Sequence, residues 1–177
     1  MEDLEHLPAV VRPGIARAVI EIPAGSTDKR QYDPTSGTFP VDLRNGKPRR
    51  LAFLPYPANY GFIPGTRMDR TQGGDGDALD VFVLCGSLPS GTVMEIEPIG
   101  IIKLLDADER DDKVIALPVD RSLLALDADD LCELPSAARD IRVTWLLNYD
   151  PTDGAKLVAI EGRNEAWEAI ERWAIVR

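Results

Sequence analysis

The chain is poor in the residues on which many enzymes build nucleophiles and zinc sites. Its 177 residues include one histidine and two cysteines. A Ser-His-Asp or Cys-His system would depend on His6, in an N-terminal leader that has little to pack against. Histidine-ligated zinc needs more than one such ligand, and two cysteines are too few for a thiolate cage or a disulfide framework. Any catalysis therefore has to use carboxylates, lysine, arginine, tyrosine and bound metal.

Long apolar runs and an excess of basic residues are also missing. Proline and glycine interrupt the uncharged stretches 51–66 and 81–94, so neither spans a bilayer, and no signal-peptide pattern opens the sequence. We expect a cytoplasmic protein without a membrane partner. The 30 acidic residues outnumber the 20 basic ones and give a net charge of -10, which repels nucleic acid and attracts metal cations.

The remaining composition is that of a folded protein, with 44% hydrophobic and 28% charged residues. The length predicts one domain over residues 1–177, with residues 1–12 as a loosely packed leader. Alternation over 17–22 predicts a half-buried strand in which Glu21 faces away from the core side. Further apolar, β-branched segments predict strands over 81–85, 92–105, 113–119 and 156–161.

Two helices are predicted in the last third of the chain. Ser136 can cap a helix that ends near Tyr149 and buries a face containing Ile141 and Trp145. Asn164 can cap a second helix. Strands first and helices last predict an α+β, mainly β fold, most simply a small closed barrel with the C-terminal helices packed outside.

Residues 73–81, Gly-Gly-Asp-Gly-Asp-Ala-Leu-Asp-Val, place three carboxylates beside three glycines. In an extended strand Asp75 and Asp77 would share one face while Asp80 pointed the other way, so a common site requires the chain to curl, which glycine permits. Converging carboxylates repel each other unless a divalent cation lies between them. The alternative is a solvated acidic turn.

A second acidic loop, residues 106–112, lies between two predicted strands. If these strands form a hairpin, Asp106 approaches Asp111 or Asp112, with Lys113 beside them. Alone, such a loop is typical of solvated surface. Two acidic loops together with several basic residues favour Mg²⁺ and phosphoryl chemistry, because Mg²⁺ prefers oxygen ligands and shares phosphate oxygens with Lys and Arg.

A third feature is the aromatic segment 56–62, Tyr-Pro-Ala-Asn-Tyr-Gly-Phe. Tyr60 is as compatible with a core position as with a functional one. Tyr56 lies beside prolines that restrict its backbone, so its hydroxyl can donate to an oxyanion with little loss of freedom.

These residues resemble the family I soluble inorganic pyrophosphatases. Asp75 to Val81 is similar to the family signature, and Ile20 to Pro23, Tyr56 to Gly61 and Gly100 to Lys113 resemble its other landmarks in the right order. The resemblance runs from about Arg17 to Gly162. It implies an OB-like five-stranded closed β-barrel with flanking C-terminal helices, and Mg²⁺-dependent hydrolysis of pyrophosphate by in-line attack of a metal-bridging hydroxide.

The same resemblance implies three to four Mg²⁺ ions per site, with Mn²⁺ or Zn²⁺ as possible substitutes. Asp75, Asp80 and Asp111 would hold the two activating ions. Asp106 would hold an ion that arrives with substrate, and Glu21 would be a further ligand. Short bacterial members are commonly hexamers, so a homo-oligomer, with a hexamer favoured, is implied.

The implied catalytic residues are Asp77 as the general base, Tyr56 and Lys113. The implied phosphate-binding residues are Lys29, Arg44, Tyr56, Lys113 and Tyr149. Arg49 and Arg50 are alternatives to Arg44, because the spacing from Asp42 is one residue longer than is usual in the family.

Two departures from the family pattern bear on affinity. Gln31 stands where Glu is usual, and Asp150 stands where a phosphate-binding Lys is usual. If Asp150 lines the cleft, its replacement by Lys should improve substrate binding. Three alternatives stay open: a paralogue that cleaves another phosphoanhydride, a non-catalytic metal or phosphate sensor, and an oligonucleotide-binding barrel, which the charge and the 6% aromatic content disfavour.

Overall fold

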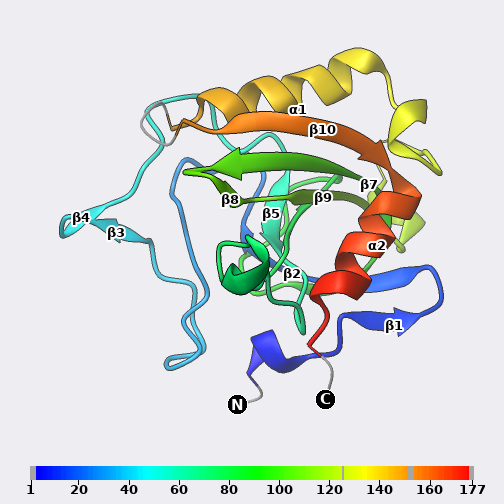
Figure 1. Cartoon of the computed structure of the whole chain (residues 1–177). Helices are drawn as coiled ribbons and strands as arrows, with labels where there is room; N and C mark the ends of the chain where they lie inside the picture. Colours follow the sequence, from blue (N-terminus) through cyan, green and yellow to red (C-terminus); the bar gives the residue numbers. More distant parts are fainter. Residues whose placement is uncertain (1–2, 125, 151–153, 176–177) are drawn as a thin grey trace.

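The computed structural model describes residues 3–124, 126–150 and 154–175, and within them the chain forms ten strands, two α-helices and four 3₁₀ helices (Figure 1). The strands are β1 (Val10–Arg12), β2 (Ile15–Ile22), β3 (Leu43–Arg44), β4 (Lys47–Pro48), β5 (Asn59–Phe62), β6 (Asp80–Val83), β7 (Val93–Asp106), β8 (Glu109–Arg110), β9 (Lys113–Pro118) and β10 (Lys156–Gly162). The helices are α1 (Ser136–Asn148), α2 (Arg163–Trp173), η1 (Leu4–His6), η2 (Arg70–Gln72), η3 (Arg121–Leu123) and η4 (Leu131–Glu133).

Five of the strands close on themselves. They pair in the order β2, β5, β6, β9 and β7, and β7 also pairs with β2. The β6–β9 pair is parallel and the other pairs are antiparallel. β1 extends the sheet beyond β2, and β10 extends it beyond β7. α1 lies along β10 and α2 beside β7 (Figure 1), so the predicted fold class is confirmed.

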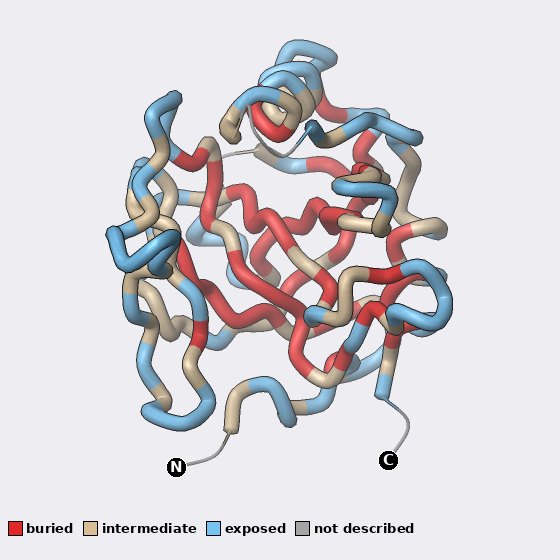
Figure 2. Tube along the Cα trace, turned by 60° about the vertical axis from the view of Figure 1, so that its left-hand side comes forward, coloured by how far each residue is buried: buried red, intermediate tan, exposed pale blue. Residues whose placement is uncertain are grey.

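Strands β6 and β9 are buried on both faces, because alternate side chains enter two different apolar clusters. Val81 and Val83 pack in the cluster that contains Ile170 of α2, while Phe82 packs in the cluster that contains Trp145 of α1. Strands that are covered on both faces are expected to have continuous apolar sequences, as β6 and β9 do. Figure 2 shows these buried segments at the centre, with exposed loops around them.

Both helices begin earlier than the capping pattern suggested, α1 by one residue and α2 by two. Ser136 is the first residue of α1, with Pro135 at the cap, and Asn164 lies inside α2. Asp130 supplies the missing cap from a distance, because its carboxylate accepts a hydrogen bond from the backbone N–H of Arg163 at 2.8 Å. Side-chain caps satisfy N–H groups wherever the oxygen comes from, so local sequence alone does not reveal this partner.

The face predicted for α1 is only partly correct. Trp145 and Leu146 are buried, but Ile141 is 60% exposed. In the described part of the chain, neither helix is both long and apolar enough to cross a membrane.

The N-terminal leader differs from the loosely packed segment that we expected. β1 pairs with β2, and the N–H of Arg17 donates to the carbonyl of Ala9 at 2.8 Å. The carbonyl of Glu5 accepts from the N–H of Gly65 at 2.8 Å, and the N–H of Leu4 donates to the Tyr32 hydroxyl at 3.2 Å. Residues 3–12 are thus attached to the ring of strands.

Candidate active site

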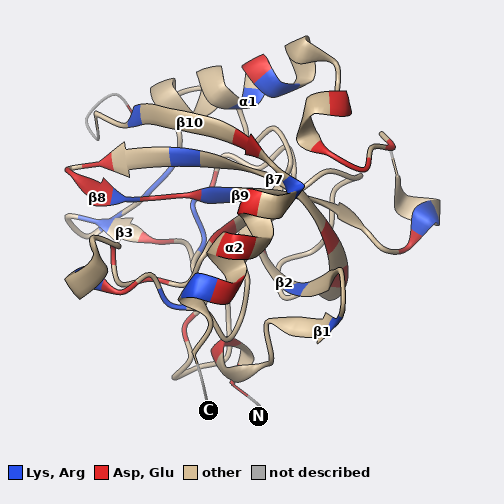
Figure 3. Cartoon of the chain, turned by 45° about the vertical axis from the view of Figure 1, so that its right-hand side comes forward, with Lys and Arg blue, Asp and Glu red and all other residues tan. Residues whose placement is uncertain are grey.

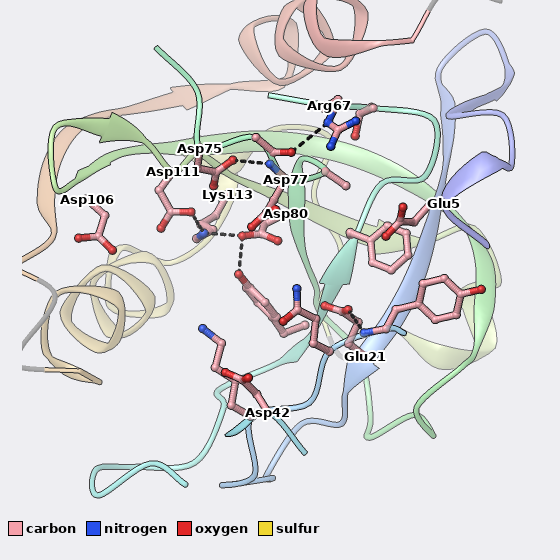
Figure 4. Close-up of a pocket in the computed structure, with 18 of the residues that line it drawn as sticks. Glu5, Glu21, Asp42, Arg67, Asp75, Asp77, Asp80, Asp106, Asp111 and Lys113 are labelled. Carbon is pink, nitrogen blue, oxygen red and sulfur yellow. Dashed lines mark hydrogen bonds and ion pairs between the residues drawn. The ribbon is translucent and has the colours of Figure 1, made fainter. Parts of the chain in front are cut away.

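A cavity of about 540 Å³ opens where β6 and β9 begin and β7 ends. Its walls include every predicted site residue except Tyr56, namely Glu21, Lys29, Arg44, Asp75, Asp77, Asp80, Asp106, Asp111, Lys113 and Tyr149. Figure 4 shows Asp75, Asp77, Asp80 and Asp111 around Lys113, with Asp42 on the opposite side. The fold thus brings these predicted residues together around one cavity, and their roles stay predictions.

The glycines of the loop before β6 let the chain curl as predicted. Gly73 and Gly76 have φ angles of 83° and 91°, in the left-handed region that favours glycine. A Cβ atom on Gly74 would lie 2.5 Å from the backbone of Met68, so that position also requires glycine. The turn is closed by the N–H of Asp77, which donates to Asp75 Oδ1 at 2.9 Å.

The two acidic loops lie side by side. The N–H of Arg110 donates to the carbonyl of Gly73 at 2.8 Å, and Gly74 forms a bridge with Arg110. The predicted hairpin also forms, because β7 pairs with both β8 and β9. Figure 3 shows acidic residues at the ends of β7 and β8 and basic residues around β3, and both segments contribute residues to the cavity.

Lys113 is the centre of the acidic cluster. The parallel β6–β9 register puts it directly opposite Asp80. Its ammonium lies 2.5 Å from Asp80 Oδ2 and also forms an ion pair with Asp111. Burial alone would disfavour the ammonium, but Asp80 and Asp111 raise the pKa of Lys113 above its ordinary value.

The surroundings of Asp75 and Asp80 disfavour the ionised form of their carboxylates. Burial raises the pKa of Asp75 to about 6, and the Asp80 and Asp111 charges add to that effect. Burial likewise raises the pKa of Asp80, although Lys113 opposes the shift. Strong shifts of this kind concentrate at functional sites, where a ligand of opposite charge relieves them.

The orientation of Glu21 differs from the one predicted. Its side chain is 8% exposed and lines the cavity, whereas the alternation of β2 predicted that it faces away from the core. The alternation failed because both faces of β2 are buried, and Val19, two residues before Glu21, packs in an apolar cluster with Tyr32 and Phe62. Glu21 Oε1 accepts a hydrogen bond from the N–H of Tyr32 at 2.7 Å, and burial raises its pKa to about 8.

The fit of these residues to a divalent cation rests on their chemistry. In residues 3–124, 126–150 and 154–175, no three His, Cys, Asp or Glu side chains converge closely enough to hold one ion. Lys113 lies between Asp80 and Asp111 and serves as their cation. Oxygen donors are the ligands that Mg²⁺ prefers, and a cation would favour their ionised forms, so the donor set fits.

Basic residues line the cavity as well. Lys29, Arg44 and Arg49 line it, and the N–H of Lys29 donates to the carbonyl of Arg49 at 2.9 Å. Burial lowers the pKa of Lys29, and the nearby Arg49 charge lowers it further. Segment 45–50 begins with an Asn-Gly turn between β3 and β4, in which Asn45 and Gly46 both have positive φ.

The positions of the three tyrosines near the cavity differ from the prediction. Tyr56 is 3% exposed and lies outside the cavity wall, against Trp145 with ring centroids 4.7 Å apart. The direct phosphate contact predicted for Tyr56 stays a prediction. Tyr149 does line the cavity and stacks on Trp145. Tyr60, which we could not separate from a core residue, lines the cavity and donates its hydroxyl proton to Asp80 Oδ2 at 2.5 Å.

Two further groups escaped the sequence analysis. The pairing of Tyr60 with Phe82 places Tyr60 diagonally opposite Asp80, and only this register identifies its partner. Glu5 and His6 of the leader also line the cavity, together with Arg67. No local motif marks Glu5 and His6, because the packing of η1 brings them to the cavity.

Comparisons with known proteins agree with this geometry. The family model described as inorganic pyrophosphatase matches residues 18–175. The chain is 35% identical over 164 residues to an inorganic pyrophosphatase of Sulfolobus acidocaldarius, covering 90% of this chain and 88% of that protein. It is 40% identical over 161 residues to one of Gluconobacter oxydans, covering 89% and 86%.

The fold is similar as well. The crystal structure of inorganic pyrophosphatase from Thermus thermophilus superposes with a TM-score of 0.84 at 29% identity, covering 98% of this chain and 97% of that one. Together with the family match over most of the sequence, this likeness means that the chain belongs to the inorganic pyrophosphatase family.

Proposed function

We propose that this chain hydrolyses inorganic pyrophosphate to two orthophosphates in a Mg²⁺-dependent reaction. The observation that carries the proposal is that one cavity contains both the carboxylates around Lys113 and the basic residues Lys29, Arg44 and Arg49. Pyrophosphate needs positive groups for its oxygens, and a hard cation needs the carboxylates.

The metal ligands we assign are the acidic residues of the cavity. Asp75, Asp80 and Asp111 would hold the activating ions, and Asp106 and Glu21 would be further ligands. Three to four Mg²⁺ ions fit the pattern of the family, with Mn²⁺ or Zn²⁺ as possible substitutes. Bound Mg²⁺ would neutralise phosphoryl charge and make water more acidic.

The remaining side chains bind substrate and move a proton. Asp77 accepts the proton of the attacking water, since it lines the cavity and its carboxylate is not engaged with Lys113 in the described interactions. Lys113, Lys29, Arg44 and Tyr149 stabilise charge on the two phosphoryl groups. Tyr60 acts indirectly, because its hydroxyl donates a hydrogen bond to Asp80, one of the proposed metal ligands. Tyr56 supports the Tyr60 ring from behind, with centroids 5.4 Å apart.

We also propose a homo-oligomer, with a hexamer favoured from the family resemblance, in the cytoplasm. Strand β10 pairs with β7 on one side, and Leu157 and Val158 on it are 41% and 58% exposed. Apolar side chains on an edge strand are suited to cover by another subunit. Light scattering at micromolar concentration should show an oligomer, and a monomer would refute this part.

The test of the proposed function is phosphate release from pyrophosphate with and without divalent ions. We expect two phosphates per pyrophosphate with Mg²⁺, none without a metal, and inhibition by Ca²⁺, which coordinates more loosely at longer distances. Turnover without metal, or none with any divalent ion, would overturn it. Parallel assays with triphosphate and nucleotides distinguish a paralogue that prefers another phosphoanhydride.

A further inference from the structure

The carboxylate of Asp150 joins two arginines from a distant part of the chain. Its Oδ2 atom accepts hydrogen bonds from Arg44 Nη1 at 2.9 Å and from Arg49 Nη2 at 3.0 Å. The side chains of Asp150 and Arg49 are 13% and 17% exposed. The Arg44 side chain is 45% exposed, so the Arg49 bond is the shielded one, and a shielded charge-assisted hydrogen bond is stronger and more restrictive than a surface ion pair.

The arginines, and not Asp150, form the cavity wall. Arg44 and Arg49 both line the cavity, and Asp150 is not among its lining residues. Asp150 directly follows Tyr149, which also lines the cavity. The carboxylate thus contacts both guanidinium groups away from the space where an anion would bind.

Backbone contacts fix Arg49 beside Lys29. The carbonyl of Arg49 accepts from the N–H of Lys29 at 2.9 Å, and its own N–H donates to the carbonyl of Asp42 at 2.7 Å. Arg49 Nη1 also lies 3.4 Å from Asp42 Oδ2. Lys29, Arg44 and Arg49 therefore occupy one side of the cavity despite their mutual repulsion, an arrangement expected where a multiply charged anion binds.

We propose that Arg49 is a second phosphate-binding arginine beside Arg44, and that Asp150 is a positioning residue that orients both guanidinium groups toward substrate. This inference rests on the proposed function and adds a residue to its binding site. A planar guanidinium can bind two phosphate oxygens at once, and holding it in place beforehand lowers the entropy lost on binding. The inference also reverses the sequence-based expectation for Asp150→Lys, since a lysine there would repel the arginines and weaken binding.

The experiment measures KM and kcat for magnesium pyrophosphate, together with equilibrium binding of inorganic phosphate in the presence of Mg²⁺. We expect Arg49→Ala to raise KM roughly 10- to 100-fold, the usual effect of removing a charged hydrogen-bond donor, with a smaller change in kcat. Arg49→Lys, which keeps the charge but not the fork, should fall between. Asp150→Ala and Asp150→Lys should raise KM, and Asp150→Glu should recover part of the loss.

The matched control is Asp127→Asn, which breaks an exposed pair with Arg121 outside the cavity and should change neither constant. A double-mutant cycle separates positioning from a general structural role. If Asp150 acts through its arginines, Asp150→Ala should add less to KM in the Arg49→Ala background than in the wild type. Circular dichroism checks that each variant folds, and Asp150→Asn provides a milder substitution.

An unchanged KM and unchanged phosphate binding in Arg49→Ala would overturn the role of Arg49. Fully additive effects of Asp150→Ala and Arg49→Ala, or no effect of Asp150→Ala, would overturn the positioning role. If the wild type does not hydrolyse pyrophosphate, the proposed function fails, and the phosphate-binding comparison still decides whether Arg49 and Asp150 form an anion site.

Discussion

The ring of strands buries apolar side chains, whereas the cavity at its edge buries charged and polar ones. Along β6 and β9 nearly every side chain enters an apolar cluster, as Phe82 and Ile115 do. A few residues away the same strands begin with Asp80 and Lys113, and Glu21 is buried as a carboxyl group. One region gains stability from burial, and the other buries groups that prefer water.

The difference indicates where stability and function separate. Apolar burial in the ring offsets the electrostatic cost of the cavity, and that cost is lowered when cations and phosphate bind. Variants in the two regions should therefore have opposite signatures: activity lost with the fold intact for the cavity, and stability lost with the chemistry intact for the ring.

The largest effect is expected for Asp77→Asn. This nearly isosteric change removes the proposed proton acceptor, so kcat should fall roughly 10²- to 10⁴-fold at neutral pH, with recovery at higher pH. The unfolding free energy should change by less than about 0.5 kcal/mol, as for most substitutions outside the core. Steady-state kinetics and urea unfolding on one sample measure both.

Asp80→Asn distinguishes a metal ligand from a base. It should weaken Mg²⁺ binding and leave an activity that partly recovers as Mg²⁺ is raised, whereas Asp77→Asn should keep near-normal metal affinity. The same metal dependence and the same pH profile in both variants would show that these aspartates act only as a collective cage.

In the ring, Ile115→Ala should have the opposite signature. Ile115 is fully buried, and truncating such a side chain leaves a cavity that costs about 2–5 kcal/mol of unfolding free energy. The kcat of the folded fraction should stay near the wild-type value. A large loss of kcat without a loss of stability would contradict the separation of the two regions.

Glu21→Gln should stabilise the metal-free protein, and only at higher pH. Since the pKa of Glu21 is raised from 4.5 to about 8 on folding, the wild type loses stability as the pH rises from about 4.5 toward 8. One pKa unit corresponds to about 1.4 kcal/mol, so the rise from 4.5 to about 8 sets an upper limit of roughly 4–5 kcal/mol for the gain at pH 8. Urea unfolding with a chelator at pH 5 and pH 8 measures this gain, and an equal gain at both pH values would exclude the charge as its cause.

The smallest effect concerns the distant cap of α2. Asp130→Ala should cost about 0.5–2 kcal/mol of unfolding free energy and leave activity unchanged, because it removes the acceptor for the N–H groups of Arg163 and Cys132. These hydrogen bonds hold the pKa of Asp130 below its ordinary value, so this contribution is present above about pH 4 and is lost as the pH falls through the lowered pKa. Thermal unfolding at pH 3 and pH 7 tests the sign.

The sequence predicted those features whose physical cause is local. The glycines around Asp75 predicted a curled acidic loop, and the β-branched runs predicted the strands β7 and β9. The predicted aspartates of the two acidic loops lie in one cavity because loops joined to paired strands have to approach each other.

What the sequence could not predict depends on pairing between distant segments. The hydroxyl bond from Tyr60 to Asp80 follows from the β5–β6 register, and the burial of Glu21 follows from the packing of the segment around Tyr32 against β2. Asp150 looked unfavourable for phosphate binding because its partners Arg44 and Arg49 are about a hundred positions earlier in the chain.

Whether the carboxylates around Lys113 form the working cation site is tested most directly by the unfolding temperature as Mg²⁺ is titrated. A ligand that binds the folded state raises this temperature with its concentration. The wild type and the control Asp127→Asn should show the same rise, and Asp80→Asn a much smaller one at each Mg²⁺ concentration. An equal rise in all three proteins, or no rise in the wild type, would contradict the assignment.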